Sequence, residues 1–137
     1  MSAAGADGVT HAGLAEPDVF LDGRLRLFQP ERGHKAGTDA ILLIAAAGQG
    51  DCVVDLGSGG GVVGLGLLAL GRARRVLLVE RDAEAAGFAR RNVALNGFDA
   101  EAAIVEADIA ASAAALAAAG LAPGVADLVV SNPPYNE

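Results

Sequence analysis

Four short apolar segments recur along the chain, and a helix-like segment separates each one from the next. The four are CVVDL, RVLLVE, AAIVEA and ADLVVS, at residues 52–56, 75–80, 102–107 and 126–131. Their almost continuous apolar character is typical of strands that are covered on both faces. Strands that alternate with helices in this way form a parallel sheet. The sequence therefore predicts an α/β fold, a Rossmann-like doubly wound parallel sheet.

The segments between these strands carry helix start and stop signals. GVVGLGLLAL follows a glycine-rich turn, and AASAAALAAA precedes the last strand. Between them, Asp82 is expected to cap AEAAGFARRNVALN, and Gly97 is expected to end it. The sequence thus places one helix in each crossover between strands.

A hairpin and a helix are expected ahead of the sheet. VFLDGRLRLFQ, at residues 19–29, alternates around Asp22-Gly23, a dipeptide that favours a hairpin because both turn positions need positive φ. Thr38 is expected to cap a helix over DAILLIAAAG, and Gly48 to end it. We expect residues 1–17 to form a disordered leader and residues 18–137 to form a single domain.

The composition limits the cellular compartments in which the chain is expected to act. Residues 1–17 contain no Lys or Arg and no apolar core, so they do not form a secretory signal. No apolar run reaches the roughly 18 to 20 residues of a membrane span. Cys52 is the single cysteine, which excludes an internal disulfide and favours a reducing, cytoplasmic location. Its apolar neighbours predict a buried small side chain, not a reactive thiol.

The net charge of −7 argues against non-specific electrostatic binding of nucleic acid. The basic residues are unevenly spread, however, with Arg24, Arg26, Arg32 and Lys35 close together near the front. Such a cluster is either an ordinary charged face or a contact for a polyanion. The sequence leaves both interpretations open.

A polar side chain stands at or just after the end of each expected strand. Asp55, Glu80, Asp108 and Asn132 follow one another at intervals of about 24 to 28 residues. In open parallel sheets, ligands bind outside the carboxyl ends of the strands. We therefore expect these four side chains to line one shared cleft. No metal site is expected.

The first strand end carries the glycine-rich stretch DLGSGGGVVG, which fits two cofactors. Gly59-x-Gly61-x-x-Gly64 matches the dinucleotide fingerprint, with Glu80 about 20 residues downstream for a ribose. The alternative pattern is D-x-G-x-G-x-G from Asp55, in which an acid precedes a closely approaching backbone. That order suits S-adenosyl-L-methionine (SAM), which has an ammonium and no phosphate, and Glu80 fits the ribose diol of either cofactor. A purely structural strand-to-helix turn is the third interpretation.

Asp108, in EADI, fits two roles. Its carboxylate is placed to accept a hydrogen bond from the amino group of adenine, with Ile109 packed on the ring. The structural alternative is a cap on the helix that follows.

The last expected strand runs into Asn132-Pro133-Pro134-Tyr135, which the two prolines stiffen. An exocyclic amino group is a poor nucleophile, since its lone pair is delocalised. The Asn132 side-chain oxygen and the Pro133 carbonyl would hold its two hydrogens and free that lone pair for the methyl of SAM. Tyr135 would offer a flat face to a planar substrate. Catalysis of this kind depends on positioning and electrostatics. The structural alternative is that the NPPY segment is only a rigid loop.

Taken together, these residues resemble the class I SAM-dependent methyltransferases, and NPPY resembles their amino-methylating branch. The resemblance covers the chain from about residue 19 to its end. It implies a strand order of 3-2-1-4-5-7-6, a ribose contact at Glu80 and an adenine contact at Asp108. The resemblance assigns the methionine side of SAM to the loop with Asp55, Gly57, Gly59 and Gly61. It assigns the target amine to Asn132, Pro133, Pro134 and Tyr135, and it counts Asn132 among the cofactor-binding residues as well.

A second stretch, FQPERGHKAGTDAILL, resembles the segment ahead of the first strand in bacterial tRNA (adenine-N6)-methyltransferases of the valine-tRNA type. There it helps to close the SAM pocket. The resemblance implies cofactor contacts at Lys35, Gly37, Thr38 and Asp39, since free N–H groups at a helix start suit the carboxylate of SAM. Ordinary capping is the structural alternative. The implied substrate is adenine N6 in structured RNA, most of all tRNA, in a loop where the base is easily splayed out.

The chain also departs from that family. Asn136 stands where a second aromatic residue often follows the Tyr, and the family chain continues for about a hundred residues beyond this point. A sheet that stops at ADLVVS leaves an apolar edge strand, which is an aggregation liability. We therefore expect a fold truncated after its fourth strand, self-association or another covering chain at that edge, and SAM binding with little catalysis.

Three alternative functions stay open. The first is N5-methylation of a glutamine in a protein such as a release factor, which is disfavoured because a hairpin replaces the helical domain of that group. The second is methylation of guanine N2 in ribosomal RNA. The third, from a different class, is a non-catalytic SAM-binding module.

Overall fold

The structure is a computed structural model of the 137-residue chain, and it describes residues 16–30 and 37–132. Most of the expected leader, Lys35 and residues 133–137 lie outside the described residues. Among the described residues, no helix is both long enough and apolar enough to cross a membrane.

A small antiparallel hairpin precedes the sheet, as predicted. β1 (Asp18–Phe20) pairs with β2 (Leu25–Leu27), and Phe20 lies opposite Leu25. The turn is longer than the Asp22-Gly23 dipeptide alone, because a 3-10 turn, η1 (Leu21–Gly23), occupies it. Leu21 and Asp22 have φ of 54° and 55°, and Gly23 has 87°. Leu25 is fully buried, which fixes the register of the hairpin against the rest of the domain.

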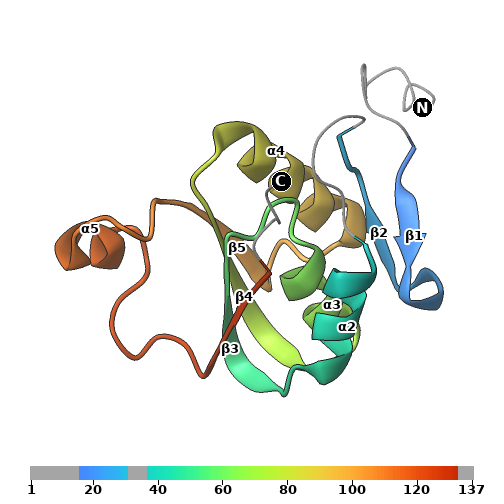
Figure 1. The fold of residues 1–137 in the computed structure, drawn as a ribbon, viewed down its shortest axis with the longest axis horizontal. Helices are drawn as coiled ribbons and strands as arrows, with labels where there is room; N and C mark the ends of the chain where they lie inside the picture. Colours follow the sequence, from blue (N-terminus) through green and yellow to red (C-terminus); the bar gives the residue numbers. More distant parts are fainter. Residues whose placement is uncertain (1–15, 31–36, 133–137) are drawn as a thin grey trace.

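Four parallel strands form the main sheet in the order β5-β4-β3-β6 (Figure 1). Their bounds are β3 (Gly50–Leu56), β4 (Ala73–Glu80), β5 (Ala102–Glu106) and β6 (Leu128–Ser131). This order corresponds to 3-2-1-4 when the sheet strands are counted along the chain, as the resemblance implied for the first four strands. The α/β fold, the parallel sheet and the preceding hairpin are therefore confirmed.

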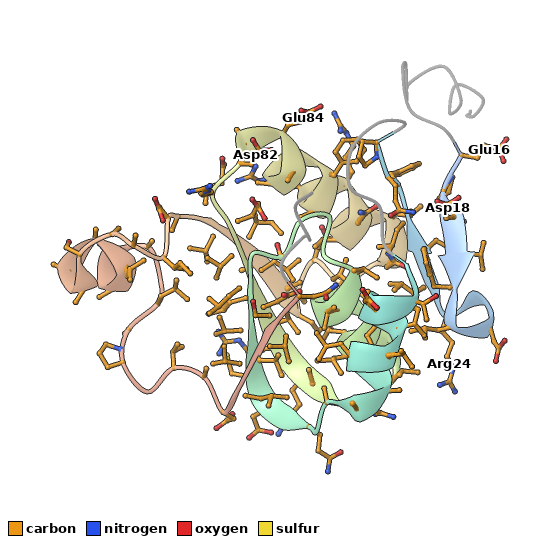
Figure 2. All side chains as sticks on the ribbon, viewed as in Figure 1. Glu16, Asp18, Arg24, Asp82 and Glu84 are labelled. Carbon is orange, nitrogen blue, oxygen red and sulfur yellow. The ribbon has the colours of Figure 1, made fainter. Side chains whose placement is uncertain are left out.

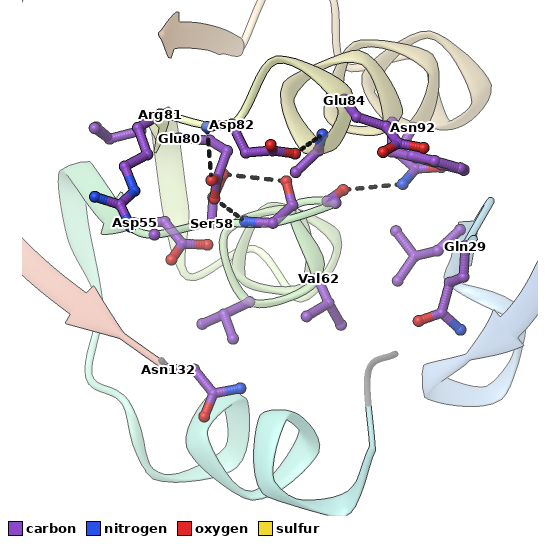
Figure 3. A pocket seen from close by; sticks show the side chains of 18 of the residues that line it. Gln29, Asp55, Ser58, Val62, Glu80, Arg81, Asp82, Glu84, Asn92 and Asn132 are labelled. Carbon is purple, nitrogen blue, oxygen red and sulfur yellow. Dashed lines mark hydrogen bonds between the residues drawn. The ribbon is translucent and has the colours of Figure 1, made fainter. Parts of the chain in front are cut away.

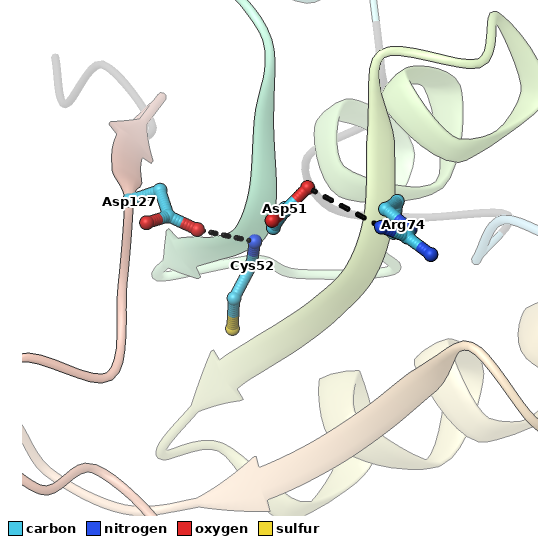
Figure 4. Close-up of polar contacts among 4 residues, drawn as sticks. All are labelled: Asp51, Cys52, Arg74 and Asp127. Atoms are coloured by element: carbon cyan, nitrogen blue, oxygen red, sulfur yellow. Dashed lines mark hydrogen bonds and ion pairs between the residues drawn. The ribbon is translucent and has the colours of Figure 1, made fainter.

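Asp127 fixes the register of β6 on β3 (Figure 4). Its carboxylate accepts a hydrogen bond from the Cys52 N–H at 2.9 Å, and its own N–H donates to the Cys52 carbonyl at 2.8 Å. Beside it, Asp51 and Arg74 form an exposed ion pair at 3.9 Å, a kind of contact that contributes little. Because β6 is held in this register, Asn132 emerges beside the loop that follows β3.

Three helices cover one face of the sheet, and their apolar side chains pack with those of the sheet in the larger buried core. They are α2 (Thr38–Ala46), α3 (Val62–Ala69) and α4 (Ala83–Asn96). Within that core, Val53, Val76 and Leu78 point from the sheet toward the helices. α3 packs closely on β4 at Gly64, which has no side chain to hold the two elements apart.

The opposite face of the sheet differs from the expectation of a helical cover. Its buried residues include Cys52, confirmed as a small buried side chain, and they pack against the segment that carries Leu121 and Val125. The fourth helix, α5 (Ala113–Ala118), buries none of its residues and stands to the side of the sheet (Figure 1). Its Ala-rich sequence explains this, since it offers little apolar area to bury.

Two helix-end predictions are confirmed and two are wrong. Asp82 caps α4 by accepting from the Ala85 N–H at 2.8 Å, and Gly97 ends it with a φ of 73°. Thr38 does not cap α2: the extended Gly37 is the N-cap, and Thr38 is already helical. The helix also ends before Gly48, because Ala47 already adopts an extended conformation.

Candidate functional site

A cavity of about 660 Å³ opens at the carboxyl ends of the parallel strands (Figure 3). The ends of β3, β4, β5 and β6 contribute to it, and so do the start of α4 and the chain that leaves β2. It therefore lies where ligands bind in open parallel sheets. The predicted residues that line it are Asp55, Gly57, Gly59, Glu80, Asp108 and Asn132.

The other predicted site residues are placed differently. Gly61 precedes α3 and is not part of the cavity lining. Gly37, Thr38 and Asp39 are exposed at the start of α2 and do not line it either. Lys35, Pro133, Pro134 and Tyr135 lie outside the described residues.

The glycine-rich loop has a backbone that requires its glycines. Gly57, Gly59 and Gly61 have φ of 68°, 57° and 95°, a region that other residues rarely adopt. Gly64 is different: it is helical, and packing alone requires it, since an added Cβ would lie 2.6 Å from Leu78. The conformational demand therefore follows the D-x-G-x-G-x-G spacing that begins at Asp55.

Asp55 ends β3 deep under this loop and is 1% exposed. One carboxylate oxygen accepts a hydrogen bond from the Gly64 N–H at 3.0 Å. Burial raises the pKa of Asp55 from 3.8 to about 7; the Gly64 bond opposes this rise, and the charge of Glu80 adds to it. A buried acid with a raised pKa that faces a cavity is a candidate ligand for a cation.

Glu80 ends β4 and uses both carboxylate oxygens on backbone donors. One accepts from the Gly59 N–H at 2.8 Å, and the other accepts from the Asp82 N–H at 3.0 Å. Each carboxylate oxygen can accept two hydrogen bonds, so capacity for a diol remains. The side chain therefore holds the loop and faces the cavity at the same time.

Asp108 follows β5 and does not cap α5. Its carboxylate accepts from the Ala110 N–H at 2.9 Å, while Ser112 caps α5 by accepting from Ala115 at 3.1 Å. The capping alternative for Asp108 is therefore wrong. Next to it, the Ile109 side chain is 56% exposed and lines the cavity, as an apolar surface for a flat ring would.

The charged residues of the cavity lining are mostly acidic. Figure 2 shows Asp82 and Glu84 at the start of α4, and Figure 3 shows them beside Glu80 at the cavity. The charged lining consists of five carboxylates and one guanidinium, from Asp55, Glu80, Asp82, Glu84, Asp108 and Arg81. Such a lining favours a cationic ligand and opposes a pyrophosphate. No cluster suited to a metal ion occurs within residues 16–30 and 37–132.

Asn92 is a cavity residue that the sequence pattern did not single out. It is fully buried on α4, and its carboxamide contacts both Phe28 and the Gly60 carbonyl. A signal was present, since a polar residue there interrupts the apolar stripe of Phe88, Ala89 and Val93. Phe28 and Gln29, which begin the FQPERGHKAGTDAILL stretch, also line the cavity, although the sequence patterns assigned neither of them a role of its own.

Residues 32–137 match the family model of the methyltransferase small domain. Two Anaeromyxobacter proteins named ribosomal RNA small subunit methyltransferase A are 40% identical over 107 residues, covering 76% of this chain. The chain spans only 36% of the length of those curated relatives.

Solved structures share the fold. An Agrobacterium tumefaciens protein described as a predicted O-methyltransferase matches with a TM-score of 0.59 and 38% identity, over 70% of this chain and 49% of its own. A Pyrococcus horikoshii protein provisionally assigned as an RNA methyltransferase gives 0.56 and 29% identity, over 76% of this chain and 48% of its own.

Proposed function

The chain belongs to the methyltransferase small domain family, and from this premise we propose that it is the SAM-binding part of an RNA methyltransferase. The methyl acceptor is an exocyclic amino group, most of all adenine N6 in tRNA. The observation that carries the proposal is the acidic cavity at four strand ends, with a D-x-G-x-G-x-G loop on one side and Asn132 on another.

The residues of the cavity fit SAM and do not fit a dinucleotide. SAM supplies, when bound, a methyl group on a positively charged sulfur, together with an ammonium and a carboxylate. Asp55 would receive the ammonium, Glu80 the ribose diol, and Asp108 the adenine amino group. The pyrophosphate of NAD would instead face five carboxylates and a single guanidinium.

Bound SAM would supply its methyl group to the amino nitrogen of the substrate, and the electron pair of the broken carbon–sulfur bond would stay on sulfur. The methylated nitrogen would then release a proton to water. The Asn132 side chain lines the cavity, and its amide oxygen would hold one hydrogen of that amine. Pro133, Pro134 and Tyr135 stay in this proposal on the strength of the sequence motif alone.

RNA is favoured over protein as the substrate by the relatives. Proteins named as RNA methyltransferases occur among both the curated and the structural matches. The Anaeromyxobacter name specifies ribosomal RNA, so a base in ribosomal RNA is the direct competitor of a base in tRNA. Cys52 is free and buried, which suits action in a reducing compartment such as the cytoplasm.

Two measurements test the proposal. The first compares thermal unfolding with SAM and with NAD, since a ligand at 100 times its Kd stabilises by about 2.7 kcal/mol. Stabilisation by NAD and not by SAM would reverse the cofactor assignment. The second measures transfer of a labelled methyl group to bulk tRNA, ribosomal RNA and a release factor in parallel. Labelling of the release factor alone would establish the glutamine alternative. SAM binding by the full-length protein without any transfer would support the non-catalytic module.

A further inference from the structure

Two asparagines of α4 pair with the backbone of β2 and of Phe28, the residue that follows it, in place of a neighbouring strand. Asn96 accepts from the Arg26 N–H at 2.9 Å and donates to the Arg26 carbonyl at 2.7 Å. Asn92 does the same with Phe28, accepting at 2.6 Å and donating at 3.1 Å. Residues four apart on a helix are separated by about 6 Å, which matches two residues along a strand.

The two asparagines differ in their remaining hydrogen bond. Asn96 donates to the Asn92 carbonyl at 2.8 Å, within its own helix. Asn92 donates to the Gly60 carbonyl at 2.9 Å, in the glycine-rich loop (Figure 3). A carboxamide offers one acceptor oxygen and two donor hydrogens, so the three bonds of Asn92 use all three groups.

Each partner of Asn92 belongs to the cavity wall. Phe28 and Gly60 line the cavity together with Asn92 itself, while Arg26 and Asn96 do not. Phe28 lies 64 residues from Asn92 and Gly60 lies 32 residues from it, so three distant segments meet on one side chain. We propose that Asn92 is a positioning residue for SAM, which holds the exit of the hairpin against the glycine-rich loop.

The physical reason is preorganisation, and the inference rests on the proposed function. Without Asn92, the Phe28 N–H, the Phe28 carbonyl and the Gly60 carbonyl would each lose a hydrogen bond, the two at Phe28 in a buried position and the one at Gly60 in a part-buried position. Losing hydrogen bonds at buried polar groups is unfavourable, so the contact that holds the hairpin exit against the glycine-rich loop would loosen. A cavity that must first close on its ligand binds it more weakly.

Asn92→Asp tests this, with Asn96→Asp as the matched control on the same helix. An ionised carboxylate at 92 still accepts from Phe28 but faces two carbonyl oxygens; once protonated, it can donate to one of them. We measure SAM affinity by calorimetry between about pH 5.5 and about pH 8.5. The affinity of each variant is divided by the wild-type affinity at the same pH, because burial raises the pKa of Asp55 to about 7 and its ionisation contributes to the pH dependence of the wild type.

At the higher pH, Asn92→Asp should bind SAM about tenfold more weakly than wild type, as the loss of one to two hydrogen bonds predicts. At the lower pH, its affinity should be largely restored. Asn96→Asp should lower stability and leave the affinity within about threefold of wild type. Equal losses in both variants, no loss in Asn92→Asp, or a loss that is the same at every pH would overturn the proposal.

A second pair keeps the test decisive where Asn92→Asp does not fold. Asn92→Ala and Asn96→Ala are then compared in trimethylamine N-oxide, which favours the folded state. Weaker SAM binding by Asn92→Ala alone supports the proposal, and equal binding by both variants contradicts it. A wild-type protein that binds no SAM would defeat the proposed function and this inference together. Wild-type binding with unaffected variants would defeat this inference only.

Discussion

The Gly59 N–H donates a hydrogen bond of 2.8 Å to the Glu80 carboxylate, although the two residues lie 21 positions apart. The contact joins the loop after β3 to the end of β4, where the second oxygen of Glu80 accepts from Asp82. The Glu80 side chain therefore holds the glycine-rich loop in position relative to the sheet, and it also lines the cavity. Its replacement should affect loop geometry and ligand contact together.

Glu80→Gln should weaken SAM binding about ten- to a hundredfold, the equivalent of one or two lost hydrogen bonds. A glutamine has one acceptor oxygen, so its NH2 would face the Gly59 or Asp82 N–H, donor against donor. Calorimetric titration with SAM measures the effect. Glu84→Gln is the control, because Glu84 lines the same cavity without a hydrogen bond to the loop among the described residues. Equal losses in both variants would indicate a general charge effect.

Asp55→Asn should stabilise the unliganded protein in a pH-dependent way. The folded-state pKa of Asp55 is about 7, against 3.8 for the ordinary group, so between these values the folded protein binds the extra proton. Stability therefore falls as the pH rises from about 4 to about 7, and the loss persists above that. Asparagine keeps an acceptor for Gly64 and carries no charge. Denaturant unfolding should show a gain of up to a few kcal/mol near pH 8 and little gain near pH 4.

The same substitution should weaken the binding of SAM. An ammonium beside Asp55 favours its ionised form, so wild-type affinity should rise between about pH 6 and about pH 8. Asp55→Asn should bind more weakly and lose that rise. Calorimetry across this range checks both statements, and an unchanged pH dependence in Asp55→Asn would show that Asp55 is not the titrating group.

Gly64→Ala should destabilise the protein by about 1 to 3 kcal/mol through overpacking. The added Cβ would lie 2.6 Å from Leu78 and 2.7 Å from Val76, both in the body of β4. Gly87→Ala on α4 is the matched control, since its Cβ would meet nothing within 4 Å. That change should stabilise by about 0.5 to 1 kcal/mol, the usual effect of replacing a helical glycine. Denaturant unfolding measures both, and a neutral Gly64→Ala would contradict the close packing of α3 on β4.

Local sequence signals predict a structural feature correctly where that feature depends only on residues close by in the sequence. Asp82 and Gly97 bound α4 as predicted, because a side-chain cap and a left-handed glycine act within one helical turn. Thr38 was assigned the wrong place because Gly37, with no side chain to signal it, adopts the extended N-cap conformation. The hairpin turn includes Leu21 because burial of Leu25 selects the register.

The same distinction applies to the cavity. Asp55, Glu80, Asp108 and Asn132 could be predicted because the ends of parallel strands meet at one edge of the sheet. Asn92 could not be assigned a role, because its partners are backbone groups 32 and 64 residues away. A polar residue in the apolar stripe of α4 marks the position of Asn92, but the residue types do not indicate its backbone partners, which only the folded chain reveals.

The outer edge of β6 should mediate self-association of this chain. Within the described residues β6 pairs with β3 alone, and its Val129 side chain is 54% exposed. An unpaired apolar edge strand can form hydrogen bonds with a strand of another molecule, and a lysine on that strand opposes such pairing. Sedimentation velocity should show association that grows with concentration and is reduced in Val129→Lys. A wild-type chain that stays monomeric at every concentration would contradict this.

Asn132→Ala should abolish methyl transfer in the full-length protein while SAM binding stays within about threefold of wild type. Asn132 lies at the end of β6 and lines the cavity, but the cofactor contacts proposed above belong to the other three strand ends. Loss of its amide oxygen removes an acceptor that acts on the substrate amine in the transition state, so kcat falls more than cofactor affinity does. Single-turnover transfer of a labelled methyl group, beside calorimetry with SAM, separates the two quantities. Asn132→Asp is the informative companion, since it keeps an acceptor oxygen and should retain more activity than alanine. Transfer by Asn132→Ala at a rate near wild type would mean that another group orients the amine.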